Sequence, residues 1–408
     1  MQDWSELAVR EMPAMSARRR PEELPPLAAP LLAFVEDSLS RPLVGITTEG
    51  ALRPGLFTLE PTGVPTTPLL EAASAFLGTL SAAQRDQATF AVDADERRTW
   101  FNIHPNLFRH GLLIEELTSP QRTAALRLLQ ATLSARGYQQ ARDVMRLNEL
   151  LAEITGRADE YGEWPYFVSF FGTPTPDQPW GWQLDGHHLN LNAFVVGDHL
   201  AATPSFMGSE PCSVASGPLA GTRVFEPEER NGLGLVRSLD AGQRAKAILF
   251  PSILPGELPP ERDRPIDGQM IACAFQDNRV IGYEGVRGDE LSDGQRRLLR
   301  ELVGTYVGWR REDHAAVTMR EIDAHLDETH FCWMGGTGPE DPFYYRAHSP
   351  VVLVEFNHEA GVVFEHDAPY RHHTHTVVRT PNGGDYGVDL LRQHYERFDH
   401  AQGGHIAT

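Results

Sequence analysis

Four short segments of the chain share one pattern, and they constrain where its helices begin. In each segment a leucine precedes Ser, Thr or Asp, and a Gln-Arg pair starts three residues after that polar residue. This is the spacing of a capping box, in which both side chains satisfy free backbone amides of a first helical turn. The pattern therefore predicts helix starts in LSAAQR (80–85), LTSPQR (117–122), LDAGQR (239–244) and LSDGQR (291–296).

The recurrence of this pattern has two explanations. An internal duplication would copy it, and independent helices that use the same starting chemistry would also show it. The spacings between the four copies are uneven and their flanking residues differ. These differences favour independent helix starts.

Helical periodicity dominates two stretches of the chain, from about 67 to 155 and from 297 to 327. The first stretch includes TPLLEAASAFLGTL and TAALRLLQATLSARG. The second of these segments is expected to end at Gly137, because glycine commonly follows the last residue of a helix.

Strand character prevails elsewhere. Residues 164–206 and the segments after His330 are rich in β-branched and aromatic residues. Residues 41–59 are expected to form two short strands joined near Glu49-Gly50, and residues 269–286 a hairpin that turns at Asp277-Asn278. This mixture predicts an α+β fold, in which a helical N-terminal half packs on a mostly antiparallel sheet.

The 408-residue chain is long enough for two domains or one large one. Residues 1–30 are rich in proline and charge, which indicates a flexible N-terminal arm. Residues 31–160 form a mainly helical region, and residues 161–408 an α+β region that carries the histidine-rich segments. We expect these two regions to form one integrated domain.

The net charge of −20, from 56 acidic and 36 basic residues, argues against partners such as nucleic acid or an anionic membrane. The three cysteines include no CxxC pair, which argues against a disulfide framework and a thiolate zinc site. The first residues contain no apolar signal-peptide core, and no stretch reaches the ~20 apolar residues of a membrane span. We therefore expect a cytoplasmic protein.

Histidines concentrate near the C-terminal end, in YRHHTHTVVRT (370–380). In a strand, alternate residues share a face, so His373 and His375 point the same way. Two imidazoles on one strand face are suited to binding a single metal ion. A surface pair, or two hydrogen-bonded core histidines, is the alternative.

A second pair of histidines lies in DGHHLNLNAF (185–194). Read as a strand, this segment places His188, Asn190 and Asn192 on one face and His187 on the other. Its aromatic surroundings, which include Trp182, are typical of a pocket wall, and Asp185 is a candidate for orienting a ligating histidine. The alternative is an ordinary exposed strand face.

Three further acidic or basic residues are candidates. Glu355 ends an apolar run, so its carboxylate should be paired with a base such as Arg346, or bound to an ion. In the turn TPNGGDYG, Asp385 is either a helix cap or, with Arg379, part of the rim of a substrate site. Arg379 would then bind an anionic substrate group.

The segment HFCWMGGTGPEDPFYY (330–345) contributes His330 and Tyr345. These side chains are candidates for an aromatic pocket wall that contacts substrate. Core packing is the alternative for both residues.

At these motifs the chain resembles a known family, the domain of unknown function numbered 3500. The resemblance spans about residues 70–400. It is carried by RHGLLIEELTSPQR, FFGTPTPDQPWGWQLDGHHLNLN, TPSFMGSEP, AGTRVF, HFCWMGG, FYYR, VEF, HTHTVVRTPNGGDYG and DLLRQHY. This chain departs from many members in having NHEAG after VEF, and Val378 where others have Trp, so it resembles a side branch. The resemblance implies that the paired histidines of the DGHH and H-x-H segments are family hallmarks.

These observations favour a metal-dependent enzyme. His187 or His188 would join His373 and His375 around one divalent ion (Fe, Cu or Zn), and Glu355 would complete the shell. We expect an oxidoreductase that acts on a small polar or carboxylate-bearing metabolite, and both a monomer and a homo-oligomer are open for its assembly. The alternatives are a zinc-dependent or metal-free hydrolase or lyase, and a non-catalytic binding protein. Every metal-binding hypothesis requires that the side chains of residues 187–188 and 373–375 lie close together in the fold.

Overall fold

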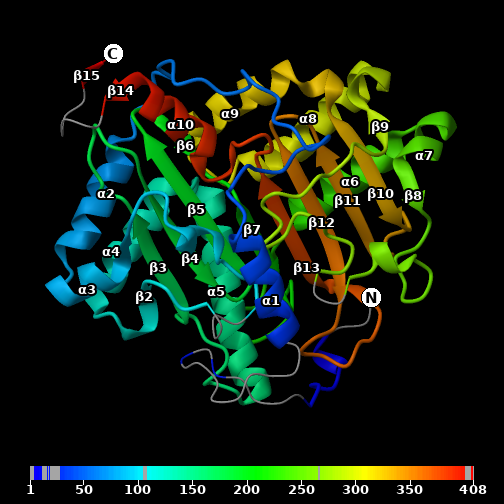
Figure 1. Cartoon of the computed structure of the whole chain (residues 1–408). Coiled ribbons are helices and arrows are strands. Elements are labelled where there is room, and N and C mark those ends of the chain that lie inside the picture. Colours follow the sequence, from blue (N-terminus) through cyan, green and yellow to red (C-terminus); the bar gives the residue numbers. More distant parts are fainter. Residues whose placement is uncertain are drawn as a thin grey trace.

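A single mixed sheet of 13 strands runs through the molecule, and most of its strand pairs are antiparallel (Figure 1). The computed structural model describes residues 4–11, 16, 18, 28–103, 108–264, 267–399 and 406–407. The strand order is β1-β3-β4-β5-β7-β13-β12-β11-β10-β8, and β2, β6 and β9 pair with β3, β5 and β10. The predicted α+β class is confirmed.

The strands of this sheet are β1 (Thr89–Phe90), β2 (Leu112–Leu113), β3 (Tyr166–Phe171), β4 (Trp180–Gly186), β5 (Leu189–Val196), β6 (His199–Ala201), β7 (Ser205–Ser209), β8 (Ile248–Phe250), β9 (Val286–Arg287), β10 (His330–Gly335), β11 (Phe343–His348), β12 (Leu353–Ala360) and β13 (Pro369–Arg379). A separate short pair consists of β14 (Phe398–Asp399) and β15 (Ile406–Ala407). The α-helices are α1 (Ala28–Leu39), α2 (Thr67–Gly78), α3 (Ala82–Ala88), α4 (Ser119–Thr132), α5 (Ala135–Thr155), α6 (Glu226–Ser238), α7 (Ala241–Ala247), α8 (Asp293–Val307), α9 (Glu312–Ala324) and α10 (Val388–Arg397).

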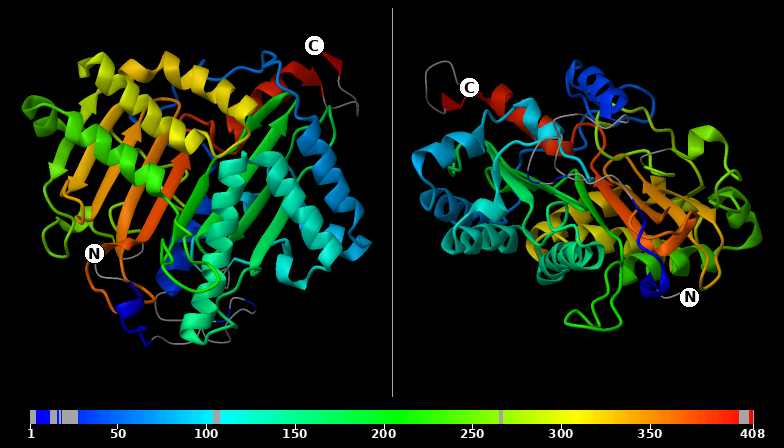
Figure 2. Two further views of the ribbon diagram at one scale, coloured as in Figure 1. Left: turned by 180° about the vertical axis from the view of Figure 1, so that it is seen from behind. Right: turned by 90° about the horizontal axis from the view of Figure 1, so that it is seen from below.

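The two faces of the sheet are covered differently. Helices such as α5, α6 and α8 pack on one face, whereas α1 and long irregular segments lie over the other (Figure 2). Successive strand residues alternate between these faces: Phe331 and Trp333 belong to the core under the helices, and Cys332 and Met334 to the core under the loops. Both faces are therefore covered, and every residue of β3, β4, β5 and β7 is buried.

All four predicted helix starts are confirmed. Capping boxes precede α3, α4, α7 and α8, with N-caps at Ser81, Thr118, Asp240 and Ser292. The expected helix end at Gly137 is wrong, because α4 ends at Thr132 and Ser134 caps a new helix. Gly137 lies in the first turn of α5, where an added Cβ would come within 2.1 Å of the Trp309 carbonyl oxygen. The absence of a side chain at Gly137 therefore lets the first turn of α5 pack closely against the backbone of Trp309.

The chain contains two copies of one arrangement of elements. The order α2-α3-β1-β2-α4-α5-β3-β4-β5 recurs as α6-α7-β8-β9-α8-α9-β10-β11-β12. In both copies the first short strand is parallel to the third and the second is antiparallel to it. The strand register also agrees, since Leu113 pairs with Phe167 and Arg287 pairs with His330.

The sequence follows the same duplication. Residues 167–196 align with residues 330–359 at a constant offset of 163, which pairs Gly172 with Gly335, both at positive φ. HGLLIEELTSPQR (110–122) aligns with EGVRGDELSDGQR (284–296), which shares its Gly, Glu-Leu and Gln-Arg positions. The interpretation of the four capping patterns as independent helix starts is therefore wrong. Loops of different length separate the matching elements in the two copies, so the duplication is hard to recognise in the sequence.

A pseudo-twofold axis relates the two copies. It passes between β7 and β13, which pair antiparallel at the centre of the sheet. On the helical side Leu133 and Arg310 form a bridge, with reciprocal hydrogen bonds from Ser134 N to Trp309 O and from Arg311 N to Thr132 O. The copies thus share one continuous sheet. The first order of elements ends at β5 and the second begins at α6.

Two expected strand segments are wrong. Residues 41–59 contain an isolated bridge from Thr47 to Val280 but no ladder strand. Residues 269–285 form turns whose apolar side chains, such as Met270 and Phe275, fill the core under the loops. Most of the arm expected over residues 1–30 lies outside the described residues. Among the described residues, no helix combines the length and apolar character needed to cross a bilayer.

Candidate metal centre

A two-residue hairpin turn carries the first pair of histidines. Gly186 ends β4 and pairs with Leu189 at the start of β5, so His187 and His188 form the turn itself. His188 adopts a left-handed backbone, with φ of 59°. The expected single strand over 185–194 is therefore wrong at this point. The backbone of His188 is held by hydrogen bonds from His188 N to Asn102 O and from Gly208 N to His188 O.

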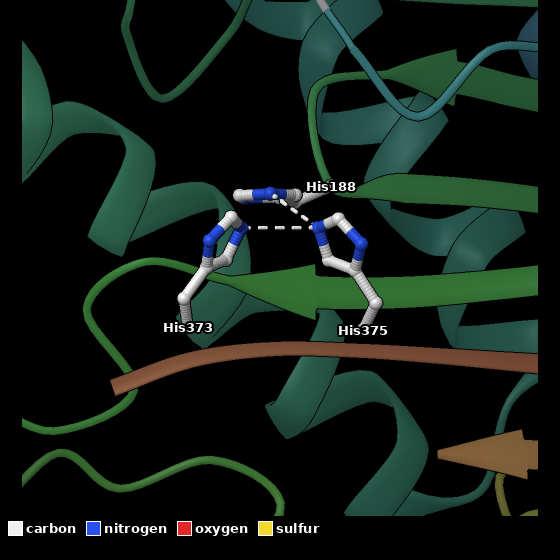
Figure 3. A group of neighbouring side chains, drawn as sticks. All are labelled: His188, His373 and His375. Carbon is white, nitrogen blue, oxygen red and sulfur yellow. Dashed lines mark hydrogen bonds between the residues drawn. The ribbon is translucent and has the colours of Figure 1, made fainter. Parts of the chain in front are cut away.

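Three imidazoles from distant parts of the chain converge beside this turn (Figure 3). The Nε2 atoms of His188 and His373 each lie 3.1 Å from Nε2 of His375. One ring nitrogen from each residue lies within 4.8 Å of the others. An ion bound to imidazoles at about 2.0–2.1 Å in a tetrahedral shell would hold the nitrogens roughly 3.3 Å apart. The cluster is thus close to metal-binding geometry.

The sheet register determines this convergence. His373 and His375 share a face of β13, as predicted, and His375 pairs across the ladder with Gly208 of β7. A Cβ at position 208 would lie 2.8 Å from Cδ2 of His375 and 3.1 Å from Cδ2 of His188. Glycine therefore allows the rings to approach each other. All three histidines are buried, with 2–7% of their surface exposed.

The outer nitrogen of His373 is fixed by the backbone. Its Nδ1 lies 2.7 Å from the carbonyl oxygen of Ala360. Because a carbonyl only accepts hydrogen bonds, Nδ1 carries the proton in this contact, and the neutral ring has its lone pair on Nε2. That lone pair is directed at the cluster.

His187, the alternative to His188, does not join the cluster of three. Its ring stacks on His188, with centroids 4.0 Å apart, and its Nδ1 lies 2.7 Å from Oδ1 of Asn148 on α5. The structure thus places His187 behind the cluster, where it supports the His188 ring.

Glu355 lies on the same face of the sheet as His373 and His375, but its carboxylate is hydrogen-bonded to other groups. Its carboxylate accepts hydrogen bonds from the amides of Ile271 and Ala272 and from the Tyr344 hydroxyl. The offset of 163 pairs it with Asn192 of the first copy, which accepts from Gln183. Glu355 is not part of the three-residue cluster, so its predicted role as a ligand is not supported by its contacts.

Asp185 and Asn190 are cross-strand partners close to the turn. One carboxylate oxygen of Asp185 accepts from the Phe101 amide, and burial raises the pKa of this carboxyl to about 8. Among the described residues, its other oxygen and Oδ1 of Asn190 have no hydrogen-bond partner. With a pKa of about 8 the Asp185 carboxyl holds its proton at neutral pH, so its other oxygen can donate a hydrogen bond, whereas Oδ1 of Asn190 accepts.

Arg379 and Asp385 form a buried ion pair away from the imidazoles. The guanidinium bonds Asp385 at 2.6 Å and Asp277 at 2.7 Å, and also donates to the carbonyls of Ala272 and Cys273. These contacts tie the loops to the sheet. They match the charge of Arg379 with protein carboxylates, so the contacts indicate a structural pair rather than a substrate anchor.

The three predicted pocket aromatics have other surroundings. Trp182 belongs to the core under the helices. The Tyr345 hydroxyl contacts that of Tyr306 at 2.5 Å and the Glu228 carbonyl at 3.0 Å. His330 stacks on Tyr283, with centroids 4.5 Å apart. The core-packing alternative describes Trp182 and Tyr345 well.

Sequence reasoning missed Glu359. Its Oε1 lies 3.6 Å from Nδ1 of His375 and accepts from Nδ2 of Asn357 at 2.6 Å. Burial raises the pKa of Glu359 to about 7. Strand alternation from Glu355 through Asn357 would have placed Glu359 on the face shared with His373 and His375, since Asn357 pairs with His375.

Comparison with known proteins gives one family. No curated protein and no solved structure shows detectable similarity to the chain. A family model described as a protein of unknown function, DUF3500, matches residues 62–388, which include both copies of the repeat and all three clustered histidines. The chain therefore belongs to the DUF3500 family.

Proposed function

We propose that this protein is a metal-dependent enzyme whose ion is bound by His188, His373 and His375. The observation that carries the proposal is the convergence of three buried Nε2 atoms, two pairs of which are 3.1 Å apart. A single cation between these ring nitrogens would be bound by lone pairs from all three imidazoles.

The donor set narrows the choice of metal. Three imidazoles without a thiolate suit iron, copper or zinc better than magnesium or calcium, which prefer oxygen ligands. Three protein ligands also leave a position for water or substrate, which distinguishes catalytic from closed structural sites. Iron or copper would supply redox chemistry, which is our first choice, and zinc would supply an activated water.

The protein groups around the cluster suggest the substrate class. Beside the hairpin that carries His188, Asp185 presents a buried carboxyl that can donate, and Asn190 presents a buried amide oxygen that accepts. A donor and an acceptor side by side suit the hydroxyl groups of a small polar metabolite, since a hydroxyl both accepts and donates. In this proposal they orient the substrate, while His187 supports the ligating ring from behind.

The test is metal analysis of untagged protein, reloaded anaerobically with Fe²⁺, Cu²⁺ or Zn²⁺. We expect about one equivalent of one metal in the wild type and less than ~0.1 equivalent in His188→Ala, His373→Ala and His375→Ala. His199→Ala, on β6 of the same sheet, is the matched control and should retain the ion.

Two results would contradict the metal proposal. Wild-type protein that retains no transition metal after reloading would contradict the proposed metal site. Activity that His375→Ala abolishes while metal content is unchanged would favour the metal-free alternative, in which a neutral imidazole acts as a base.

A further inference from the structure

We propose that Glu359 is a positioning residue of this site, whose carboxylate accepts the Nδ1 proton of His375 and so directs Nε2 of that ring at the ion. The inference rests on the proposed function and extends it to a residue outside the imidazole cluster. The geometry that carries it is the position of Glu359 behind the His375 ring, with Oε1 3.6 Å from Nδ1.

The two histidines of β13 use their ring nitrogens in the same way. Nε2 of each ring faces the cluster, and Nδ1 of each faces the end of β12. His373 meets the carbonyl of Ala360 there, and His375 meets the carboxylate of Glu359. Ligating histidines commonly donate their second N–H to a carbonyl or a carboxylate, which fixes the tautomer.

An irregularity in the ladder brings these two acceptors into place. β12 and β13 pair regularly from Leu353–Arg379 to His358–Thr374, and the register then shifts before Ala360 pairs with Pro369. A regular ladder would continue with Glu359 opposite His373. Bulges of this kind re-aim side chains next to functional sites.

The surroundings of Glu359 hold its carboxylate without neutralising it. Asn357 donates to Oε1, and a Cβ at Gly268 would lie 2.7 Å from Oε2, so the loop at Gly268 packs against the carboxylate. Asp267 and Asp263 are the acidic residues whose charges act on the Glu359 carboxylate. Within the described residues, no Lys or Arg forms an ion pair with it. A cation bound through His375 would supply the missing positive charge.

Glu210 shows that the position of Glu359 is unusual. Its Oε2 lies 3.7 Å from Nδ1 of His373. Its two oxygens, however, accept from the amides of Val362 and Val363 and from the Tyr370 hydroxyl. Glu210 therefore organises the 361–364 loop, whereas the carboxylate of Glu359 is bonded by a single amide side chain and faces the ligand ring.

The test compares Glu359→Gln with wild type in full-length, untagged protein. The Kd values of Co²⁺ and Zn²⁺ are measured by chelator competition, and the Co²⁺ absorption spectrum is recorded. We expect Kd to rise about 10- to 100-fold in Glu359→Gln, the usual effect of losing such an outer partner. The stoichiometry and the shape of the Co²⁺ bands should stay unchanged, because all three imidazoles remain.

Glu365→Gln, an exposed acid on the following loop, is the matched control and should bind like the wild type. Glu359→Asp keeps the charge and should give an intermediate Kd. It serves as the second variant if Glu359→Gln fails to fold.

Three outcomes would overturn the inference. The first is a Kd for Glu359→Gln within twofold of wild type. The second is a Co²⁺ spectrum that reports a lost ligand, which would make Glu359 a direct ligand. The third is Glu359→Asp binding no better than Glu359→Gln. Wild-type protein that binds neither ion would instead contradict the proposed function itself, so the two failures are distinguishable.

Discussion

At the scale of single residues, the cluster depends as much on a missing side chain as on the imidazoles. Gly208 lies directly opposite His375 on the neighbouring strand. A methyl group there would meet the carbonyl oxygen of Thr374 at 2.8 Å, besides both histidine rings. Such contacts are shorter than van der Waals distance, so the rings or the strands must move apart.

We therefore predict that Gly208→Ala weakens metal binding without removing a ligand. Kd should rise at least tenfold, and overpacking should lower the free energy of unfolding by about 1–3 kcal/mol. Chelator competition and urea denaturation measure the two effects. Gly234→Ala in α6, where an added Cβ meets nothing within 4 Å, is the control and should stabilise the fold by about 0.5–1 kcal/mol. Equal Kd values for both variants would refute the prediction.

Asp185 gives a prediction about pH. Burial raises the pKa of its carboxyl to about 8 in the fold, well above its ordinary value. Between these two values the unfolded chain has lost the proton that the folded chain retains, so this residue makes stability fall as pH rises. Asp185→Asn should remove that slope. The stability of the variant relative to wild type should increase from about pH 5 to about pH 8 in urea titrations. A constant difference would contradict it.

At the scale of elements, each copy of the repeat ties its two helix starts together. Nε2 of Gln121 donates to Oε1 of Gln84 in the first copy, and Nε2 of Gln295 donates to Oε1 of Gln243 in the second. The local capping chemistry was predictable, because both partners of each box are three residues apart. The contact between the two capping boxes was not predictable, because it joins residues that are 37 and 52 positions apart in sequence.

Equivalent changes in the two copies should therefore have equivalent costs. Thr118→Ala in α4 and Ser292→Ala in α8 each remove the N-cap hydroxyl of an equivalent helix and should lower the free energy of unfolding by about 0.5–2 kcal/mol. The two effects should add in the double variant, since the sites share no partner. Urea denaturation measures them, with Thr123→Ala inside α4 as the control. Strong non-additivity would contradict the independence of the two copies at these positions.

The hairpin turn shows where element-level reasoning failed. A two-residue turn is usually signalled by Asn-Gly or a similar pair with easy access to positive φ. Here His187-His188 occupies the turn, and His188 adopts a φ of 59°, which is uncommon for residues other than glycine. The strand pattern on both sides continued through the turn in sequence, so the face assignment of His188 was unreliable. Its nearness to His375 was nevertheless predicted correctly.

At the scale of the whole molecule, the candidate site joins the two copies across the pseudo-twofold axis. His188 comes from the first copy, and His373 and His375 come from the strand that follows the second. The offset of 163 pairs His188 with Val351, so the related position of the second copy carries an apolar residue. The two copies therefore repeat the order of helices and strands, whereas the imidazole at position 188 occurs in the first copy alone.

Because the ligands come from both halves, bound metal should stabilise the entire sheet. At a metal concentration of 100 times Kd, the expected gain is about 2.7 kcal/mol, seen as a higher Tm in a single unfolding transition. A chelator should reverse the shift, and His375→Ala should show none. Calorimetry with and without Zn²⁺ measures this. An unchanged Tm, or two transitions of which one alone responds, would contradict the prediction.

Local patterns were sufficient to predict the α+β class, the four helix starts and the imidazoles of the H-x-H pair, because each follows from residues within a few positions of one another. The folded chain was needed to see which histidine of the 187–188 pair joins them, that Glu355 and Arg379 bond to loops, and that Glu359 lies behind His375. These outcomes depend on the register between strands and on a ladder irregularity. Both result from packing between segments far apart in the chain, which local pattern does not encode.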